Sequence, residues 1–246
     1  MFASSSHLKF WTFSGEAELQ TLRSETSQKY LNQHAIHLSG TALVFFKRFY
    51  LNNSVMDYHP RDLMLTCIYL SCKVEEFYVP IGQFVKNLKG DREKFADIIL
   101  GFELLLMQKV HYHLTIHNPF RALEGLFIDL KTRNKEIDAE KLRKYGEEFL
   151  DQSLGTDASL IFSPSQIALS ALLASSSKEG CNLDSYVTDK LLKGASEADL
   201  QKTILQVKRI RYMVKNQEPL HKQTIQQIQK KLEKCRNQEN NPESEV

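Results

Sequence analysis

One apolar segment determines the architecture, and it reads Tyr58-His59-Pro60-Arg61-Asp62-Leu63-Met64-Leu65-Thr66-Cys67-Ile68-Tyr69-Leu70-Ser71-Cys72-Lys73-Val74-Glu75-Glu76. Pro60 suits the first turn of a helix, because its missing N–H would have no partner there. Apolar residues then cover nearly every side of the helix, which is typical of a buried, central one. The expected helix runs from about residue 60 to 77 and ends in a cluster of charges.

A second apolar helix is predicted over residues 95–110. Its broad apolar stripe consists of Phe95, Ile98, Ile99, Phe102, Leu105 and Leu106. A single carboxylate, Glu103, interrupts the run from Leu100 to Met107. One cation, Lys73, and one anion, Glu103, therefore lie at the edges of two otherwise apolar helices.

The composition favours an all-α, globular chain. Of its 246 residues only 10 are Gly and 6 are Pro, so helix breakers are scarce. A net charge of +2, from 32 Lys and Arg against 30 Asp and Glu, argues against a strongly basic nucleic-acid binder. No apolar run reaches the ~18 residues of a membrane span, and we expect no signal peptide at the N-terminus.

The two halves of the chain share a helical plan. Further helices are expected at about residues 15–30, 41–51, 80–89, 119–132, 138–160, 164–178, 182–193, 198–216 and 223–235. Aligning Pro60 with Pro164 superposes the apolar patterns of the two central helices, which indicates an internal repeat. In this alignment Lys73 meets Ser177, so the second copy lacks the charged signature. Its presence in one copy alone suggests a function for the first.

The segment Ser71-Cys72-Lys73-Val74-Glu75-Glu76-Phe77 resembles the cyclin-box signature, and Glu103, thirty residues later, matches the second signature charge. The chain is similar to cyclins that serve as regulatory subunits of the CDK-activating kinase, from Trp11 to about Arg236. The more specific phrases are Phe46-Lys47-Arg48-Phe49-Tyr50-Leu51-Asn52-Asn53-Ser54-Val55-Met56, Ile116-His117-Asn118-Pro119-Phe120-Arg121, Phe127-Ile128-Asp129-Leu130-Lys131-Thr132-Arg133 and Pro164-Ser165-Gln166-Ile167-Ala168-Leu169.

This resemblance implies a cyclin fold of two tandem helical bundles with flanking helices. We expect an N-terminal arm and helix at residues 1–38 and a first cyclin box at 39–115. A second box of five helices is expected at 116–217, and a C-terminal helix with a disordered tail at 218–246. The first box has only four predicted helices where the family has five, so it resembles a box that lacks its first helix. We therefore expect the first repeat to be less stable than the second, because lost apolar burial costs ~25 cal/mol per Å².

The resemblance also implies a function. The chain would be a nuclear, activating subunit of a protein kinase rather than an enzyme, with no cofactor. Its partners would be a cyclin-dependent kinase 7-like catalytic subunit, a RING-type assembly factor and the basal transcription factor H complex, without direct nucleic-acid or membrane contact. Lys73 and Glu103 would hydrogen-bond the kinase backbone, and Glu76, Phe77 and Tyr78 would add contacts.

The residues themselves offer no catalytic or metal-binding pattern. His111, His113 and His117 straddle a helix end without a matching carboxylate or thiol, and none of the four cysteines forms a Cys-x-x-Cys pair. Cys67 and Cys72 are expected to be reduced and packed.

Two alternatives remain. The first is a truncated isoform that binds a kinase weakly or not at all and does not activate it. The second is a DNA-binding cyclin fold like general transcription factor B, which would carry a zinc ribbon and stronger basic faces. Here the only basic stretch comprises Lys202, Lys208, Arg209, Arg211 and Lys215, and we interpret it as a solvated helix face.

Overall fold

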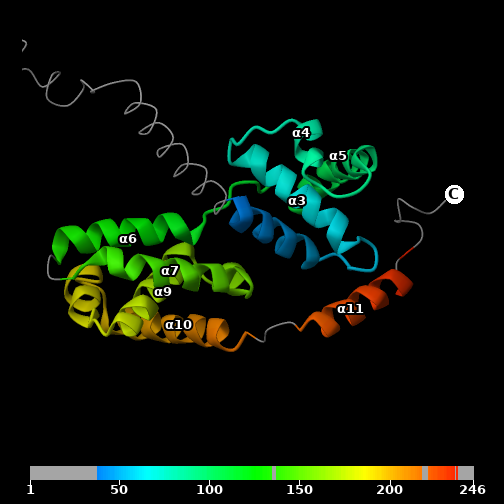
Figure 1. The fold of residues 1–246 in the computed structure, drawn as a ribbon. Coiled ribbons are helices and arrows are strands. Elements are labelled where there is room, and N and C mark those ends of the chain that lie inside the picture. The colour runs from blue at the N-terminus through cyan, green and yellow to red at the C-terminus, as the bar shows by residue number, and fades with distance from the viewer. Residues whose placement is uncertain (1–37, 135–136, 218–220, 236, 238–246) are drawn as a thin grey trace, which may run out of the picture.

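The computed structural model describes residues 38–134, 137–217, 221–235 and 237. Every regular element within these ranges is a helix (Figure 1), which confirms the all-α prediction. In the same ranges no helix is long and apolar enough to cross a membrane.

The first repeat contains a helix over residues 38–50, α3 (Pro60–Val74), α4 (Ile81–Lys86) and α5 (Arg92–Lys109). The side chain of His59 accepts a hydrogen bond from the Arg61 N–H at the start of α3, and Pro60 occupies the first turn as predicted. Phe45, Phe49, Cys67 and Leu106 form the centre of one buried cluster. A second cluster joins α3, α4 and α5.

The second repeat contains α6 (Pro119–Arg133), α7 (Ala139–Leu154), the short α8 (Ala158–Ile161), α9 (Pro164–Glu179), the π-helical η2 (Tyr186–Leu191) and α10 (Glu197–Lys215). Its central helix α9 begins like α3, with Pro164 in the first turn. Ser163 and Gln166 form a capping box there, in which each side chain accepts from the other's backbone N–H. The largest core cluster of the described residues surrounds α9.

The two repeats are joined by direct contacts as well as by the linker. The Nζ of Lys47 donates to the carbonyl oxygen of Leu154 at 2.7 Å and also to that of Thr156. Leu154 is the last residue of α7 and Thr156 follows its C-cap, Gly155, so both carbonyls lie where backbone acceptors lack helical partners. A Cβ atom on Gly40 would collide with the side chain of Asn118, so the helix over 38–50 approaches the linker closely.

The structure corrects six sequence predictions. The helix expected over 41–51 already includes residues 38–40, and α5 begins at Arg92 rather than at residue 95. The central helix ends at Val74 rather than at 77, and the helix expected over 138–160 is divided at Gly155 into α7 and α8. The segment 182–193 forms a π-helix over six residues instead of a regular α-helix. The last helix, α11 (Lys222–Cys235), has no buried residue, so its apolar seam is not packed on the bundle as expected.

α11 instead touches the first repeat at its far end, where it stands apart from α10 in Figure 1. The Nε2 of His59 lies 3.4 Å from the Oε1 of Glu233, and the Asn237 N–H donates to the Met56 carbonyl. The predicted helix at 15–30, the position of the missing first helix and nearly all of the predicted tail lie outside the described residues. The division into four segments also stays a prediction.

Candidate functional site

Lys73 and Glu103 form an ion pair between the last turn of α3 and the middle of α5. The Lys73 Nζ lies 2.6 Å and 2.8 Å from the two oxygens of Glu103. Side-chain exposure is 41% for Lys73 and 14% for Glu103. The ammonium also sits 4.8 Å from the centre of the Tyr69 ring, a cation–π contact. The two charges predicted from the sequence thus orient one another at the surface of the first repeat.

The pair retains hydrogen-bonding capacity for a partner. An ammonium has three donors and a carboxylate about four acceptor positions, so one bidentate contact leaves both groups able to bond further. Because each charge is already held by the other, little side-chain entropy remains to be lost on binding.

The turn after α3 brings the other predicted residues beside Lys73. The N–H of Glu76 donates to the Lys73 carbonyl at 3.2 Å, and that of Phe77 donates to the Cys72 carbonyl at 2.8 Å. These two bonds define a Schellman C-cap, whose left-handed position is usually glycine. Here it is Glu76, with φ of 59°. Glu76 and Tyr78 are exposed, Tyr78 at 83%, while Phe77 is half-buried.

A buried polar chain holds this turn to the second repeat. The Nδ2 of Asn118 donates to the Thr41 Oγ1 at 2.9 Å, and the Thr41 hydroxyl donates to Glu75 Oε1 at 2.6 Å. Thr41 and Asn118 are both buried. Sequence reasoning missed this chain, because Thr41 and Asn118 lie 77 residues apart and no pattern within one sequence pairs them.

Two exposed leucines flank the ion pair on α5. Leu100 and Leu104 are 48% and 56% exposed, and Leu100 lies one helical turn before Glu103. The sequence analysis did not single them out, although both fall outside the apolar stripe that it predicted for this helix. Exposed apolar side chains beside a partly buried charge are typical of a protein-binding surface.

The other titratable groups of the described residues bear on metal binding and thiol reactivity. In the part of the chain that the structure describes, no three His, Cys, Asp or Glu side chains gather as metal ligands. Cys67 and Cys72 are free thiols whose pKa is raised by burial, that of Cys67 to about 12. The site as described offers charged hydrogen-bonding groups and apolar area, which are the means of binding another protein.

Comparison with known families agrees with this description. The Cyclin, N-terminal domain family matches residues 22–115, and the Cyclin C-terminal domain family matches residues 118–237. The chain belongs to the cyclin family, and the cyclin fold predicted from its sequence is confirmed.

Within that family the chain is similar to cyclin-H. Cyclin-H of Xenopus laevis is 44% identical over 204 residues, which cover 81% of this chain and 63% of the relative. Cyclin-H1-1 of Arabidopsis thaliana is 34% identical, with 80% of this chain and 60% of the relative covered. The chain therefore spans less than two thirds of the length of these relatives.

A chain in the structure of the CAK complex from Chaetomium thermophilum bound to ATP-gamma-S has the same fold. It superposes with a TM-score of 0.68 at 26% identity and covers 96% of this chain and 88% of that one. A chain of the yeast TFIIK (Kin28/Ccl1/Tfb3) complex, at a TM-score of 0.55 and 23% identity over 86% of this chain and 99% of that one, shows the fold alone.

Proposed function

We propose that the chain is a cyclin H-like regulatory subunit that binds and activates a cyclin-dependent kinase 7-like catalytic subunit. The observation that carries this proposal is the ion pair of Lys73 and Glu103 at the cyclin signature positions, with side chains 41% and 14% exposed, and with the exposed Leu100 one turn before Glu103. Similarity to cyclin-H and to a chain of a CAK complex supports the choice of partner.

In this proposal the ion pair is the polar centre of the kinase interface. Lys73 donates to a kinase carbonyl and Glu103 accepts from a kinase N–H. Each uses a hydrogen-bonding position that the ion pair itself does not occupy. Leu100 and Leu104 supply apolar area beside them. Glu76, Phe77 and Tyr78 extend the contact along the turn after α3, where an exposed aromatic ring is a suitable anchor.

Activation follows from selective binding. The chain binds the kinase conformation in which the regulatory helix is turned inward and the kinase's own Lys–Glu ion pair is formed, so the population shifts to the active state. The cyclin adds no group to phosphoryl transfer and is not itself an enzyme. We place the complex in the nucleus, with a RING-type assembly factor as third subunit, within transcription factor H and acting on the RNA polymerase II tail and on other cell-cycle kinases.

Co-expression with the cyclin-dependent kinase 7 subunit tests the proposal, with size-exclusion chromatography and a kinase assay on a polymerase-tail peptide. Lys73→Ala and Glu103→Ala should each weaken the complex by roughly 2–5 kcal/mol, the range for truncating one member of a hydrogen-bonded charged contact at an interface. The matched control is the ion pair of Lys131 and Glu140 between α6 and α7. Lys131→Ala and Glu140→Ala should leave binding unchanged.

The same experiment separates the alternatives. Binding without activation would identify a non-activating form with an incomplete first box. A complex that forms equally well with all four variants would reject the proposed interface. A salt-dependent shift of DNA by the isolated chain would instead favour the DNA-binding class.

A further inference from the structure

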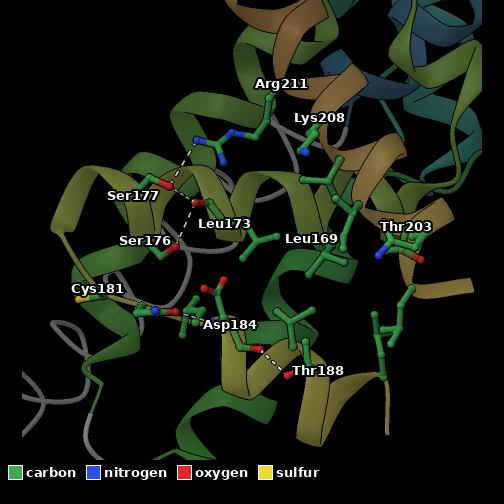
Figure 2. A pocket seen from close by; sticks show the side chains of 18 of the residues that line it. Leu169, Leu173, Ser176, Ser177, Cys181, Asp184, Thr188, Thr203, Lys208 and Arg211 are labelled. Carbon is green, nitrogen blue, oxygen red and sulfur yellow. Dashed lines mark hydrogen bonds between the residues drawn. The ribbon is translucent and has the colours of Figure 1, made fainter. Parts of the chain in front are cut away.

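The second repeat contains a groove that the proposed kinase contact does not use. It has a volume of about 760 Å³ and lies between α9, η2 and α10 (Figure 2). Its apolar lining includes Leu169, Leu173, Val187, Leu200, Ile204 and Val207. The volume falls within the ~300–1,000 Å³ of typical ligand-binding clefts. None of the described residues that line the groove is aromatic.

The sequence alignment of the two repeats identifies the position in the first repeat that corresponds to this groove. The offset that aligns Pro60 with Pro164 places Tyr69 on Leu173. In the first repeat Tyr69 is 6% exposed, and its ring packs edge-on against Phe84 of α4 with centroids 5.3 Å apart. Phe95 of α5 completes that cluster. Aromatic rings from three helices thus fill the equivalent site of the first repeat.

In the second repeat smaller side chains leave the same site hollow. Leu173 replaces the tyrosine, and Ser176 and Ser177 stand at the positions of Cys72 and Lys73. The wall opposite α9 includes η2, and π-helical turns are rare and frequently occur at functional sites. The groove therefore lies where the first repeat has an aromatic cluster in the sequence alignment, and the described residues of its own lining include no aromatic ring.

Charged groups give the groove a polarity. Lys208 and Arg211 lie together on α10 at one end, and Figure 2 shows Arg211 reaching toward Ser177, to which it donates at 3.3 Å. Glu197, in the first turn of α10, lines the other end. With a rise of 1.5 Å per residue, Lys208 and Glu197 are about 16 Å apart along the helix. Asp184 adds a second carboxylate to the lining.

We propose that this groove binds an amphipathic helix of another protein, with aromatic side chains as anchors and acidic residues at one end. The anchors occupy the space that Tyr69, Phe84 and Phe95 fill in the first repeat. The acidic end lies on Lys208 and Arg211, which matches the groove's polarity, and helix-in-groove recognition uses anchors one turn apart. Ile204, which lines the groove and is 43% exposed, is an apolar contact that such a helix can reach. The inference is independent of the kinase proposal, because the groove belongs to the second repeat.

The test uses the full chain and a fluorescein-labelled helical peptide with two phenylalanines one turn apart and glutamates at its C-terminal end. Fluorescence anisotropy should show saturable binding, and the same peptide with alanine in place of both phenylalanines should bind at least tenfold more weakly. Leu173→Tyr, which copies the first repeat, should fill the groove, abolish binding and leave the protein folded by circular dichroism.

Charge variants test the predicted orientation. Lys208→Glu should weaken binding several-fold, whereas Lys202→Glu, the same change on α10 outside the groove, should not. Failure of the peptide to bind at its solubility limit would overturn the proposal. So would unchanged binding by Leu173→Tyr, or 3-phenylpropionate binding as tightly as the peptide, which would indicate a small-molecule site.

Discussion

At the residue scale, Glu76 occupies the left-handed backbone position of the Schellman cap of α3, with φ of 59°. A left-handed backbone costs a residue with a Cβ roughly 1–2 kcal/mol relative to a right-handed one, and glycine would relieve it. The Schellman cap could form equally well with glycine, so the carboxylate itself is the feature to explain. We attribute it to the proposed kinase contact.

Glu76→Gly should therefore stabilise the chain by about 0.5–1 kcal/mol and weaken kinase binding. Urea denaturation and a binding titration measure the two effects. The matched control is His111→Gly, since His111 occupies the same left-handed position in the Schellman cap of α5, with φ of 56°. His111→Gly should stabilise the chain without weakening kinase binding. Equal kinase affinity for Glu76→Gly and the wild type would remove Glu76 from the interface.

Cys67 makes the stability of the first repeat pH-dependent. Burial raises its pKa from 9.0 to about 12, so the folded state binds the proton more tightly than the unfolded state does. The contribution of this thiol to the free energy of unfolding is fully present below about pH 9 and is lost as the pH rises toward 12. At pH 10 the loss from this thiol is on the order of 1 kcal/mol. Urea midpoints at pH 7 and pH 10 measure it, and Cys67→Ala should show a smaller difference between the two. An identical difference in both proteins would contradict the assignment.

At the element scale, the helix starts marked by proline were predictable, whereas other boundaries, such as the start of α5 at Arg92, were not. Pro60 and Pro164 mark the first turns of α3 and α9 by removing an N–H, a signal that the sequence displays directly. The end of α3 was predicted three residues late, because the left-handed position of its C-cap is occupied by Glu76 and not by the glycine that usually marks such a cap. The prediction of one helix over 138–160 was wrong because the chain turns at Gly155. There the N–H of Gly155 donates to the carbonyl of Gln152 and ends α7.

The contact of Thr41 with Glu75 and Asn118 should rigidify the turn after α3. Thr41→Val removes the hydroxyl and with it one hydrogen bond each of the buried Asn118 amide and the half-buried Glu75 carboxylate. We expect a loss of about 1–3 kcal/mol in the free energy of unfolding and weaker kinase binding. Thr41→Ser keeps the hydroxyl and should restore the binding. If Thr41→Val binds the kinase with unchanged affinity, the chain serves stability only.

At the scale of the whole molecule, the duplicated plan could be predicted but the contact between the copies could not. Helical periodicity and the alignment of Pro60 with Pro164 indicated two similar bundles. The bonds from Lys47 to the end of α7 depend on how the bundles pack, and no local pattern encodes that. In the candidate site, Lys73 and Glu103 followed from the cyclin signature, but their direct ion pair depends on the crossing of α3 and α5.

Lys47 should fix the relative position of the repeats. Lys47→Met keeps most of the apolar stem and removes both hydrogen bonds to the α7 carbonyls. We expect a loss of about 1–3 kcal/mol in stability, because two partly buried carbonyls lose a charged hydrogen-bond donor. Small-angle X-ray scattering should show a broader distribution of interatomic distances. An unchanged scattering curve and an unchanged urea midpoint would contradict this role.

The central claim is that Lys73 and Glu103 contact a kinase and do not merely hold α3 to α5. The most direct test is the affinity of the exchanged variant, Lys73→Glu with Glu103→Lys, for the cyclin-dependent kinase 7 subunit, measured by calorimetry beside its unfolding free energy. The exchange keeps opposite charges at the two positions on α3 and α5, but it reverses both contacts to the partner. We predict near-native stability with strongly reduced kinase affinity. Native affinity in the exchanged variant would contradict the account.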